Sequence, residues 1–197
     1  MPSASTLVGL DPVFDECSIV AMIFHEKKLP GVFEIHLEPQ ADARGFFART
    51  WCQKEFQRIG LTTQIAQCSV SFNTQKGTLR GMHYQATPFS ETKIIRCTKG
   101  AIYDVVVDLR PGSPAFREWA AVVLTASNRS MLYVPEGCAH GFLTLEDETE
   151  VFYQISEFFN PELARGVRWD DPAFGISWPD AIEVISDRDR TYTNFES

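Results

Sequence analysis

The stretch GTLRGMHYQ, residues 77–85, decides the fold, because a short glycine-bounded run of this kind is typical of a β-strand. In a strand, successive side chains point to opposite faces, so Leu79 and His83 share one face while Arg80 lies on the other. Either a β-bulge at Gly81 brings Arg80 and His83 together, or Arg80 serves something on the opposite face. Taken alone, His83 is better explained as a hydrogen-bonded structural histidine than as a catalyst.

Further β-rich runs surround this stretch, separated by Gly, Pro, Asn and Ser turns at spacings of roughly ten residues. They are IAQCSVSFN (65–73), TKIIRCTKG (92–100), AIYDVVVDLR (101–110), WAAVVLTA (119–126), SMLYVPEG (130–137), CAHGFLTLE (138–146) and TEVFYQISEFF (149–159). Such regular spacing predicts an all-β protein, an antiparallel sandwich or barrel.

The remaining segments are peripheral to that barrel. Residues 32–39 alternate as a half-buried strand ended by Pro39, and residues 53–61 form the best helical pattern, with Gly60 as its stop. Residues 164–179 read as an ordered loop with two tryptophans. We predict an N-terminal arm over residues 1–25 and a single domain over residues 26–197.

Composition excludes several functional classes. The chain has 197 residues, of which 44% are hydrophobic, and a net charge of -8, which does not favour nucleic-acid binding. No apolar run approaches the roughly 20 residues needed to cross a bilayer, and the N-terminus lacks a signal-peptide pattern, so a cytoplasmic location is expected. The five cysteines form no CxxC pair and read as free thiols: Cys17, Cys52, Cys68, Cys97 and Cys138.

Charged residues interrupt two of the apolar strands. In residues 101–110, alternation places Asp104 and Asp108 on one face with apolar neighbours. Because a buried charge is unfavourable unless it is paired, Asp104 should meet a cation or an imidazole, unless this face is exposed to solvent. Lys93 begins another short apolar strand, where it is either a ligand or an edge charge that prevents aggregation.

Two motifs resemble the signatures of cupin barrels. In VPEGCAHGF (134–142) a Pro-x-Gly turn precedes His140, as in the second signature, while residues 77–85 resemble the first. Metal-binding cupins carry His-x-His in the first signature, but here the second histidine position is Gln85. We therefore expect no metal, and a metal-dependent cupin is the weaker alternative.

A more specific resemblance covers nearly the whole predicted barrel. The segments ARGFFART (43–50), GTLRGMHYQ (77–85), KIIRCTKGAIYDVVVDLRPGSPAF (93–116), LYVPEGCAHGFLTL (132–145) and RGVRWDDPAFGISWP (165–179) closely resemble the dTDP-4-dehydrorhamnose 3,5-epimerase family. The resemblance implies a cupin jelly roll with a few short peripheral helices that works as a homodimer without a cofactor. Its substrate would be a nucleotide-diphosphate-linked 4-keto-6-deoxyhexose, epimerised at C3, C5 or both in deoxysugar biosynthesis.

The resemblance also assigns roles to individual residues. His83 matches the base, and Asp189 in ISDRDRTY matches its aspartate partner, with Asp187 as the adjacent competitor. Tyr153 matches the acid on the other face of the sugar, and Lys93 matches the lysine near the C4 oxygen. The expected substrate-binding residues are Arg44 and Arg80, which would grip the diphosphate, together with Gln67, Ser69, Gln85, Asp104, His140, Phe158 and Arg168.

One departure from the family pattern concerns the nucleotide. The family segment RGFFFE ends in a glutamate that accepts from thymine N3, whereas Arg49 stands there in this chain. An arginine only donates hydrogen bonds, and cytosine offers acceptors at N3 and O2, so the nucleotide is dTDP or CDP. The base pocket also changes at Gln67–Ser69 and at Phe158, whose ring carries no hydroxyl.

Two functional questions stay open at this level. A non-epimerising cupin that only binds or isomerises a nucleotide-linked keto sugar is the alternative function, although a binding module has no need for an acid and a base on opposite faces. For the dimer, residues 32–39 and their neighbour ARGFF (43–47) are the expected exchanged element, completing the pocket of the partner.

Overall fold

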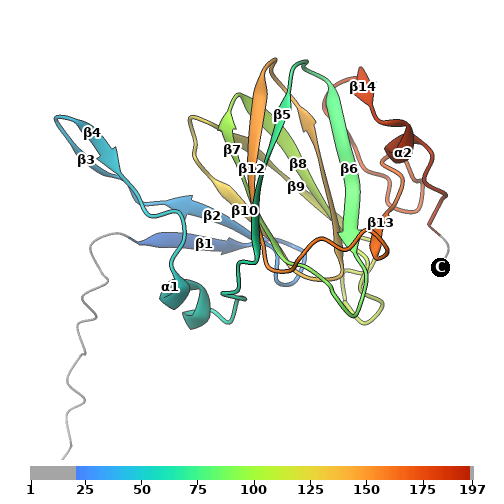
Figure 1. The fold of residues 1–197 in the computed structure, drawn as a ribbon, viewed down its shortest axis with the longest axis horizontal. Coiled ribbons are helices and arrows are strands. Elements are labelled where there is room, and N and C mark those ends of the chain that lie inside the picture. The colour runs from blue at the N-terminus through green and yellow to red at the C-terminus, as the bar shows by residue number, and fades with distance from the viewer. Residues whose placement is uncertain (1–20, 196–197) are drawn as a thin grey trace, which may run out of the picture.

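Two antiparallel sheets packed face to face form the body of the protein (Figure 1). The computed structural model describes residues 21–195. The first sheet has the order β1 (Met22–Glu26), β2 (Phe33–Leu37), β10 (Met131–Val134), β7 (Lys93–Lys99), β12 (Thr149–Ile155) and β5 (Gln67–Asn73). The second has the order β13 (Ala164–Gly166), β6 (Thr78–Gln85), β11 (Cys138–Thr144), β8 (Ala101–Asp108) and β9 (Trp119–Thr125), with β14 (Val184–Ile185) parallel to β6. This is the predicted all-β, cupin-like jelly roll.

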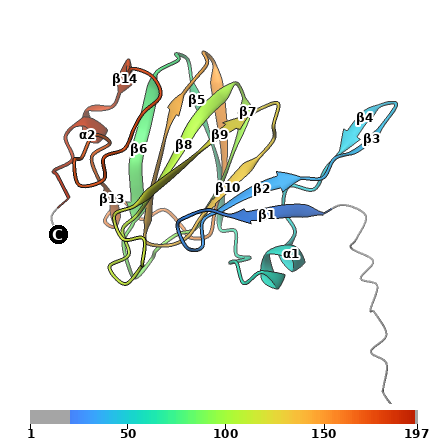
Figure 2. The same ribbon diagram turned by 180° about the vertical axis from the view of Figure 1, so that it is seen from behind.

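Smaller elements decorate the two sheets. A two-stranded hairpin, β3 (Gln40–Asp42) and β4 (Gly45–Phe47), projects from the body at the end remote from β6 and α2 (Asp187–Arg190), as both views show (Figures 1 and 2). The other helix, α1 (Gln53–Arg58), is three residues shorter than the segment predicted to be helical. Among residues 21–195, no helix is long and apolar enough to span a bilayer.

Apolar side chains fill three layers. The central layer lies between the sheets and includes Ile95, Ile102 and Phe142, all at most 1% exposed. A second layer packs Phe56 of α1 against the outer face of the first sheet. A third places Val167 and Phe174, from the segment after β13, against the outer face of the second sheet. The long segment predicted to be a loop thus serves as a cover for that sheet.

β8 shows how strand alternation and burial combine. Ile102 and Val106 point into the central layer, and Val105 lies on the opposite, covered face, so both faces of the strand are buried. Asp104 and Asp108 are consequently fully buried, which excludes the solvent-facing alternative. As expected of buried charges, each has a partner: Asp104 meets an imidazole, and Asp108 binds Arg110.

The predicted boundary of the N-terminal arm is wrong at its C-terminal end. Residues 22–25, assigned to the arm, form β1 together with Glu26, and β1 pairs with β2 in the register Met22↔Leu37. The Met22 amide donates to the buried Glu55 carboxylate at 2.8 Å, which fastens β1 to α1. This strand is held by its pairing with β2 and by Glu55, which lie outside its own residues. The rest of the predicted arm, residues 1–20, lies outside the described residues.

Candidate active site

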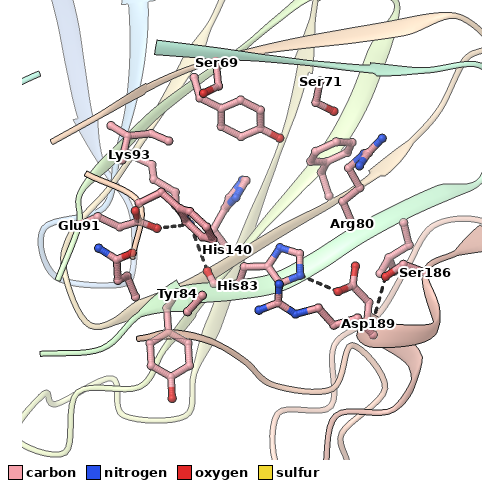
Figure 3. Close-up of a pocket in the computed structure, with 18 of the residues that line it drawn as sticks. Ser69, Ser71, Arg80, His83, Tyr84, Glu91, Lys93, His140, Ser186 and Asp189 are labelled. Carbon is pink, nitrogen blue, oxygen red and sulfur yellow. Dashed lines mark hydrogen bonds and ion pairs between the residues drawn. The ribbon is translucent and has the colours of Figure 1, made fainter. Parts of the chain in front are cut away.

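A cavity of about 660 Å³ opens between the two sheets, along β5, β6, β7 and β12, and the C-terminal segment closes one side of it. Its wall carries titratable side chains from both sheets, including Tyr153 as well as His83 and Lys93, which are labelled in Figure 3. Such a concave site, mainly apolar with a few converging charges, is the expected form of a small-molecule site.

The kink anticipated in β6 is confirmed. Opposite β11, His83 pairs with His140 and Arg80 pairs with Phe142, so three steps along β6 match two along β11. This bulge reverses the alternation of β6, and both His83 and Arg80 line the cavity. Gly81 permits it: its φ of +132° is unfavourable for other residues, and a Cβ there would lie 2.5 Å from the Cα of Gly141.

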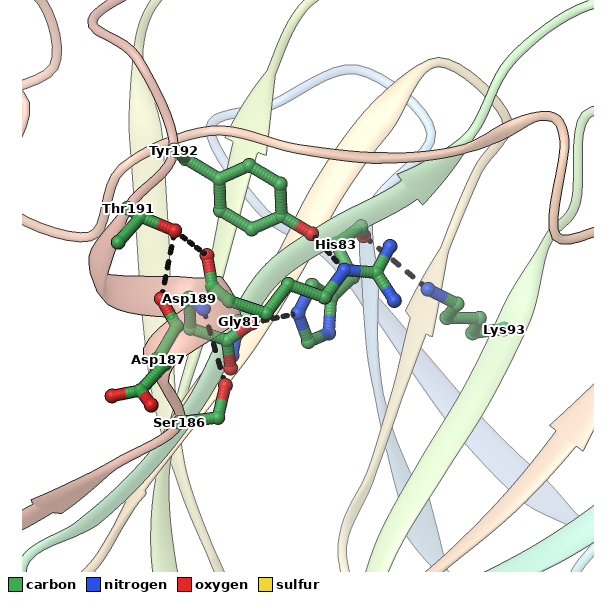
Figure 4. Close-up of polar contacts among 9 residues, drawn as sticks. Gly81, His83, Lys93, Ser186, Asp187, Asp189, Thr191 and Tyr192 are labelled. Atoms are coloured by element: carbon green, nitrogen blue, oxygen red, sulfur yellow. Dashed lines mark hydrogen bonds and ion pairs between the residues drawn. The ribbon is translucent and has the colours of Figure 1, made fainter.

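His83 is held by a buried carboxylate. Its Nε2 lies 2.6 Å from Oδ1 of Asp189, and Oδ2 of Asp189 accepts from the Gly81 amide at 3.2 Å (Figure 4). Burial alone would raise the pKa of Asp189, but the contact with His83 and the other hydrogen bonds outweigh it and lower the pKa. A charged carboxylate only accepts, so the proton sits on Nε2 and Nδ1 carries the lone pair.

The choice between Asp189 and Asp187 is decided by the turn that contains them. Ser186 caps α2, with its hydroxyl accepting from the Asp189 amide at 3.1 Å, and this turn directs Asp189 inward, where it is 3% exposed. Asp187 is exposed (Figure 4). The structure thus pairs His83 with the residue that the sequence had placed first.

Tyr153 reaches the cavity from β12. Burial raises the pKa of its phenol strongly, and the negative charge of Asp104 adds to this rise, against smaller opposing effects of Arg80 and Ser71. The phenol is therefore protonated at neutral pH, as a proton donor must be.

Lys93 lies in the cavity wall and is not an exposed edge charge. Its side chain is 12% exposed, its ammonium pairs with the carboxylate of Glu91 at 3.0 Å, and it approaches the carbonyl oxygen of His83 at 3.3 Å (Figure 3). Because the Lys93 ammonium is largely buried, solvent screens its positive charge only weakly.

A second histidine–aspartate pair lies behind the first. His140 Nε2 contacts Asp104 Oδ1 at 2.6 Å, and the His140 ring meets Tyr153 edge to face at 6.3 Å. Burial raises the pKa of Asp104, and His140 counteracts it. This pair fixes the floor of the cavity next to the phenol.

Three more predicted residues line the cavity wall, and two of them also hydrogen-bond the loop after β12. Gln67 Oε1 accepts from the Phe159 amide at 2.7 Å, and Gln85 accepts from the Asn160 amide at 2.7 Å. Ser69 points inward from β5 (Figure 3). In the part of the chain that the structure describes, no group of three or more His, Cys, Asp or Glu side chains is placed to hold a metal.

Four predicted binding residues lie away from this cavity within one chain. Arg44, in the projecting hairpin, is 90% exposed and pairs with Asp42. Arg49 pairs with the buried Glu55 at 3.2 Å. Arg168 pairs with Asp170 at 2.7 Å, and Phe158 is 66% exposed; none of these four residues lines the cavity.

Sequence reasoning missed several cavity residues. Glu91 beside Lys93, Arg188 beside Asp189, and Phe159 in place of Phe158 all line the wall. Arg188 donates from Nε to the Tyr192 hydroxyl at 2.8 Å. The sequence could have indicated Glu91 and Arg188, because each lies within two residues of a predicted catalytic residue.

The family model for dTDP-4-dehydrorhamnose 3,5-epimerase matches residues 26–197. The chain belongs to this family. A family member from Sinorhizobium fredii, named dTDP-4-dehydrorhamnose 3,5-epimerase, is 38% identical over 85% of this chain and 87% of its own. The crystal structure of the Bacillus anthracis epimerase with TDP and PPi bound superposes with a TM-score of 0.85 at 38% identity, covering 89% of this chain and all of that one.

Family members of narrower activity have the same fold. A 3'-monoepimerase from Streptomyces bikiniensis, in complex with dTDP-quinovose, matches with a TM-score of 0.80 at 34% identity, over 86% of each chain.

Proposed function

We propose that this protein is an epimerase of a dTDP-linked 4-keto-6-deoxyhexose in deoxysugar biosynthesis, acting through an enolate. The observation that carries the proposal is that the His83–Asp189 pair and the buried phenol of Tyr153 open on one cavity. An epimerase needs a base on one face of the sugar and an acid on the other. Family membership supports the same reaction.

The base step follows from the tautomer of His83. With Nε2–H donated to Asp189, the lone pair of Nδ1 takes the proton from the carbon beside the ketone. The resulting imidazolium is stabilised by the Asp189 carboxylate at 2.6 Å. The electron pair of the broken C–H bond moves into the ketone and forms an enolate.

The enolate and its reprotonation use the other two groups. The Lys93 ammonium offers positive charge for the developing oxyanion, which counts for more in a closed cavity than in water. Tyr153 then gives its phenolic proton to the same carbon from the opposite face, which inverts the centre. The His83 imidazolium then releases a proton to solvent and the Tyr153 phenolate takes one up, which completes the cycle.

The nucleotide is proposed to be dTDP, with the Arg80 guanidinium on the diphosphate. Crystal structures of similar proteins contain TDP or dTDP-linked sugars. The argument for CDP rested on Arg49 facing the base, but in this chain Arg49 pairs with Glu55. The position of Arg49 thus gives no support for a cytosine site.

We further propose a homodimer in which the β3–β4 hairpin of each protomer completes the cavity of its partner. Arg44 lies on this hairpin outside its own cavity, and the hairpin exposes Phe46 and Phe47, which are 47% and 67% exposed. Exposed aromatic rings on a projecting hairpin are typical of an interface. Free thiols at four described cysteines are consistent with a reducing cytoplasm.

Mixing two inactive variants tests the dimer. If Arg44 acts in trans, a mixed dimer of Arg44→Ala and His83→Ala contains one complete site, and activity returns on mixing. If Arg44 acts within its own chain, no complete site forms and activity stays absent. A fully active monomer in sedimentation velocity would refute the dimer itself.

Deuterium exchange tests the reaction. Wild-type protein is incubated with a dTDP-4-keto-6-deoxyhexose in D2O, and incorporation at C3 and C5 is followed by NMR; His83→Ala should abolish it at every position. Counting the deuterium atoms distinguishes a monoepimerase from a double epimerase. No exchange by wild type at saturating substrate would favour the binding-only alternative.

A further inference from the structure

Asn73 is a buried amide at the end of β5, 2% exposed, and it touches residues on two sides of the cavity. Its Oδ1 accepts from Nε of Arg80 at 2.7 Å. Its Nδ2 donates to the Ser71 hydroxyl at 3.3 Å and to the Thr149 carbonyl at 3.1 Å. Arg80 and Ser71 both line the cavity, and Thr149 lies at the start of β12, the strand that carries Tyr153.

The chemistry of the partners fixes the orientation of this amide. Arg80 can only donate, so it must face the amide oxygen, and the Thr149 carbonyl can only accept, so it must face the amide nitrogen. A rotation by 180° would break both contacts. Asn73 therefore has one orientation, anchored on β12 through Thr149.

We propose that Asn73 is a positioning residue, which fixes the diphosphate-binding Arg80 and, through Ser71, the acid Tyr153 relative to one another. This inference rests on the proposed function.

Arg80 gains most from this anchor. Its side chain is exposed, and an exposed arginine loses rotamer freedom when it binds phosphate. The bond from Nε to Asn73 and a longer contact from Nη2 to the Phe72 carbonyl, at 3.4 Å, hold the guanidinium in place before the ligand arrives. Such preorganisation strengthens binding without a new contact to the ligand.

The second set of contacts made by Asn73, the Ser71 branch, runs from its amide nitrogen through Ser71 toward the phenol of Tyr153. Ser71 accepts from Asn73, and Ser71, Arg80 and Tyr153 all line the cavity, where Ser71 and Arg80 flank the same part of the wall (Figure 3). Both Ser71 and Arg80 lower the pKa of Tyr153 against the effect of burial. Asn73 thus sets the distance between the cation and the acid.

Binding of dTDP, measured by calorimetry, tests the contact between Asn73 and Arg80 (the Arg80 branch) without turnover. Asn73→Ala should weaken binding by about tenfold, as a hydrogen bond to a charged group is lost. In an Arg80→Ala background the same change should have no further effect, because a residue that acts through Arg80 cannot add to its removal. Additive losses, or wild-type affinity of Asn73→Ala, would overturn the inference.

Asn73→Asp separates the two branches. The carboxylate still accepts from Arg80 but can no longer donate to Ser71 or to the Thr149 carbonyl, so kcat for epimerisation should fall while dTDP affinity falls less than in Asn73→Ala. Equal dTDP affinities of the Asp and Ala variants would contradict the assigned roles. Should Asn73→Ala not fold, Asn73→Ser replaces it in the same cycle.

Asn128→Ala is the matched control, since Asn128 is an exposed asparagine in the turn after β9, away from the cavity. It should leave dTDP binding unchanged. Failure of the proposed function would appear in the wild type, as missing deuterium exchange. Failure of this inference would appear only in the Asn73 variants.

Discussion

Replacing Asp189 by asparagine should switch the tautomer of His83. The carboxylate now accepts two hydrogen bonds, from Nε2 of His83 at 2.6 Å and from the Gly81 amide at 3.2 Å. An asparagine has one oxygen for these two donors. The Gly81 amide is a fixed backbone donor, whereas an imidazole can move its proton. We therefore expect the new oxygen to face Gly81 and the new NH2 group to face His83, which puts the imidazole proton on Nδ1.

The size of the effect follows from this geometry. If only the charge were lost, the imidazolium would lose a charge-assisted bond of about 1.5–3 kcal/mol, which is about a 10- to 100-fold decrease in rate. A proton on Nδ1 removes the lone pair needed for abstraction, so the loss approaches the whole contribution of a general base, roughly 10²- to 10⁴-fold. We expect Asp189→Asn to lower kcat within this second range, with little change in dTDP affinity.

The assay is the rate of deuterium exchange into the keto sugar under saturating substrate, with dTDP affinity measured in parallel. Asp187→Asn is the matched control, because Asp187 is exposed, lies two residues before Asp189 in the same helix and does not pair with His83. It should exchange at the wild-type rate. A decrease of less than about 100-fold in Asp189→Asn would refute the tautomer argument, and a larger effect of Asp187→Asn would refute the assignment of the partner.

Further predictions concern the acid, a buried ion pair and the kink. Tyr153→Phe should still exchange deuterium at a reduced rate but fail to invert the carbon, as NMR of the product would show, and full epimerisation would remove Tyr153 from the acid role. Asp108→Asn should lower the free energy of unfolding at pH 7 by about 3 kcal/mol in urea titrations, since Arg110 loses its buried partner. Burial acts to raise the pKa of Asp108, but its hydrogen bonds lower this pKa overall. The stabilisation that Asp108 contributes is therefore present above about pH 4 and is lost as the pH falls through its folded-state pKa. The free energy of unfolding of Asp108→Asn should consequently decrease less on acidification than that of the wild type. Gly81→Ala should destabilise more than Gly45→Ala by about 1–3 kcal/mol, because both glycines have a φ of +132° but only at Gly81 does a Cβ meet backbone atoms, and equal urea midpoints would contradict this.

Local pattern was sufficient for the architecture. Strand alternation and turn residues act over a few neighbours, so the runs between residues 65 and 159 predicted the sheets, and the apolar face of residues 101–108 predicted that Asp104 would need a partner. The glycine in residues 77–85 indicated a bulge for the same local reason, and β6 has it. β1 escaped prediction because its stability comes from pairing with β2 and from Glu55, which its own residues do not reveal.

The residues of the site depended on contacts across the chain. Whether Asp187 or Asp189 meets His83, 106 residues away from Asp189, was set by the Ser186 cap and the turn of α2. The anchor at Asn73 could not be found from sequence, because β5, β6 and β12 meet there only in the folded protein.

By itself the sequence determined the strand order along the chain, the two alternatives for Arg80 and the types of residue available for acid–base chemistry, and the structure chose the bulge at Gly81. Tertiary structure decided which of these residues share a cavity: it brought His83, Asp189, Lys93 and Tyr153 together. It also left Arg44 on a hairpin that projects from the body. The physical reason is that alternation is a property of neighbouring residues, whereas burial, hydrogen-bond partners and the resulting pKa shifts arise only when distant segments pack together.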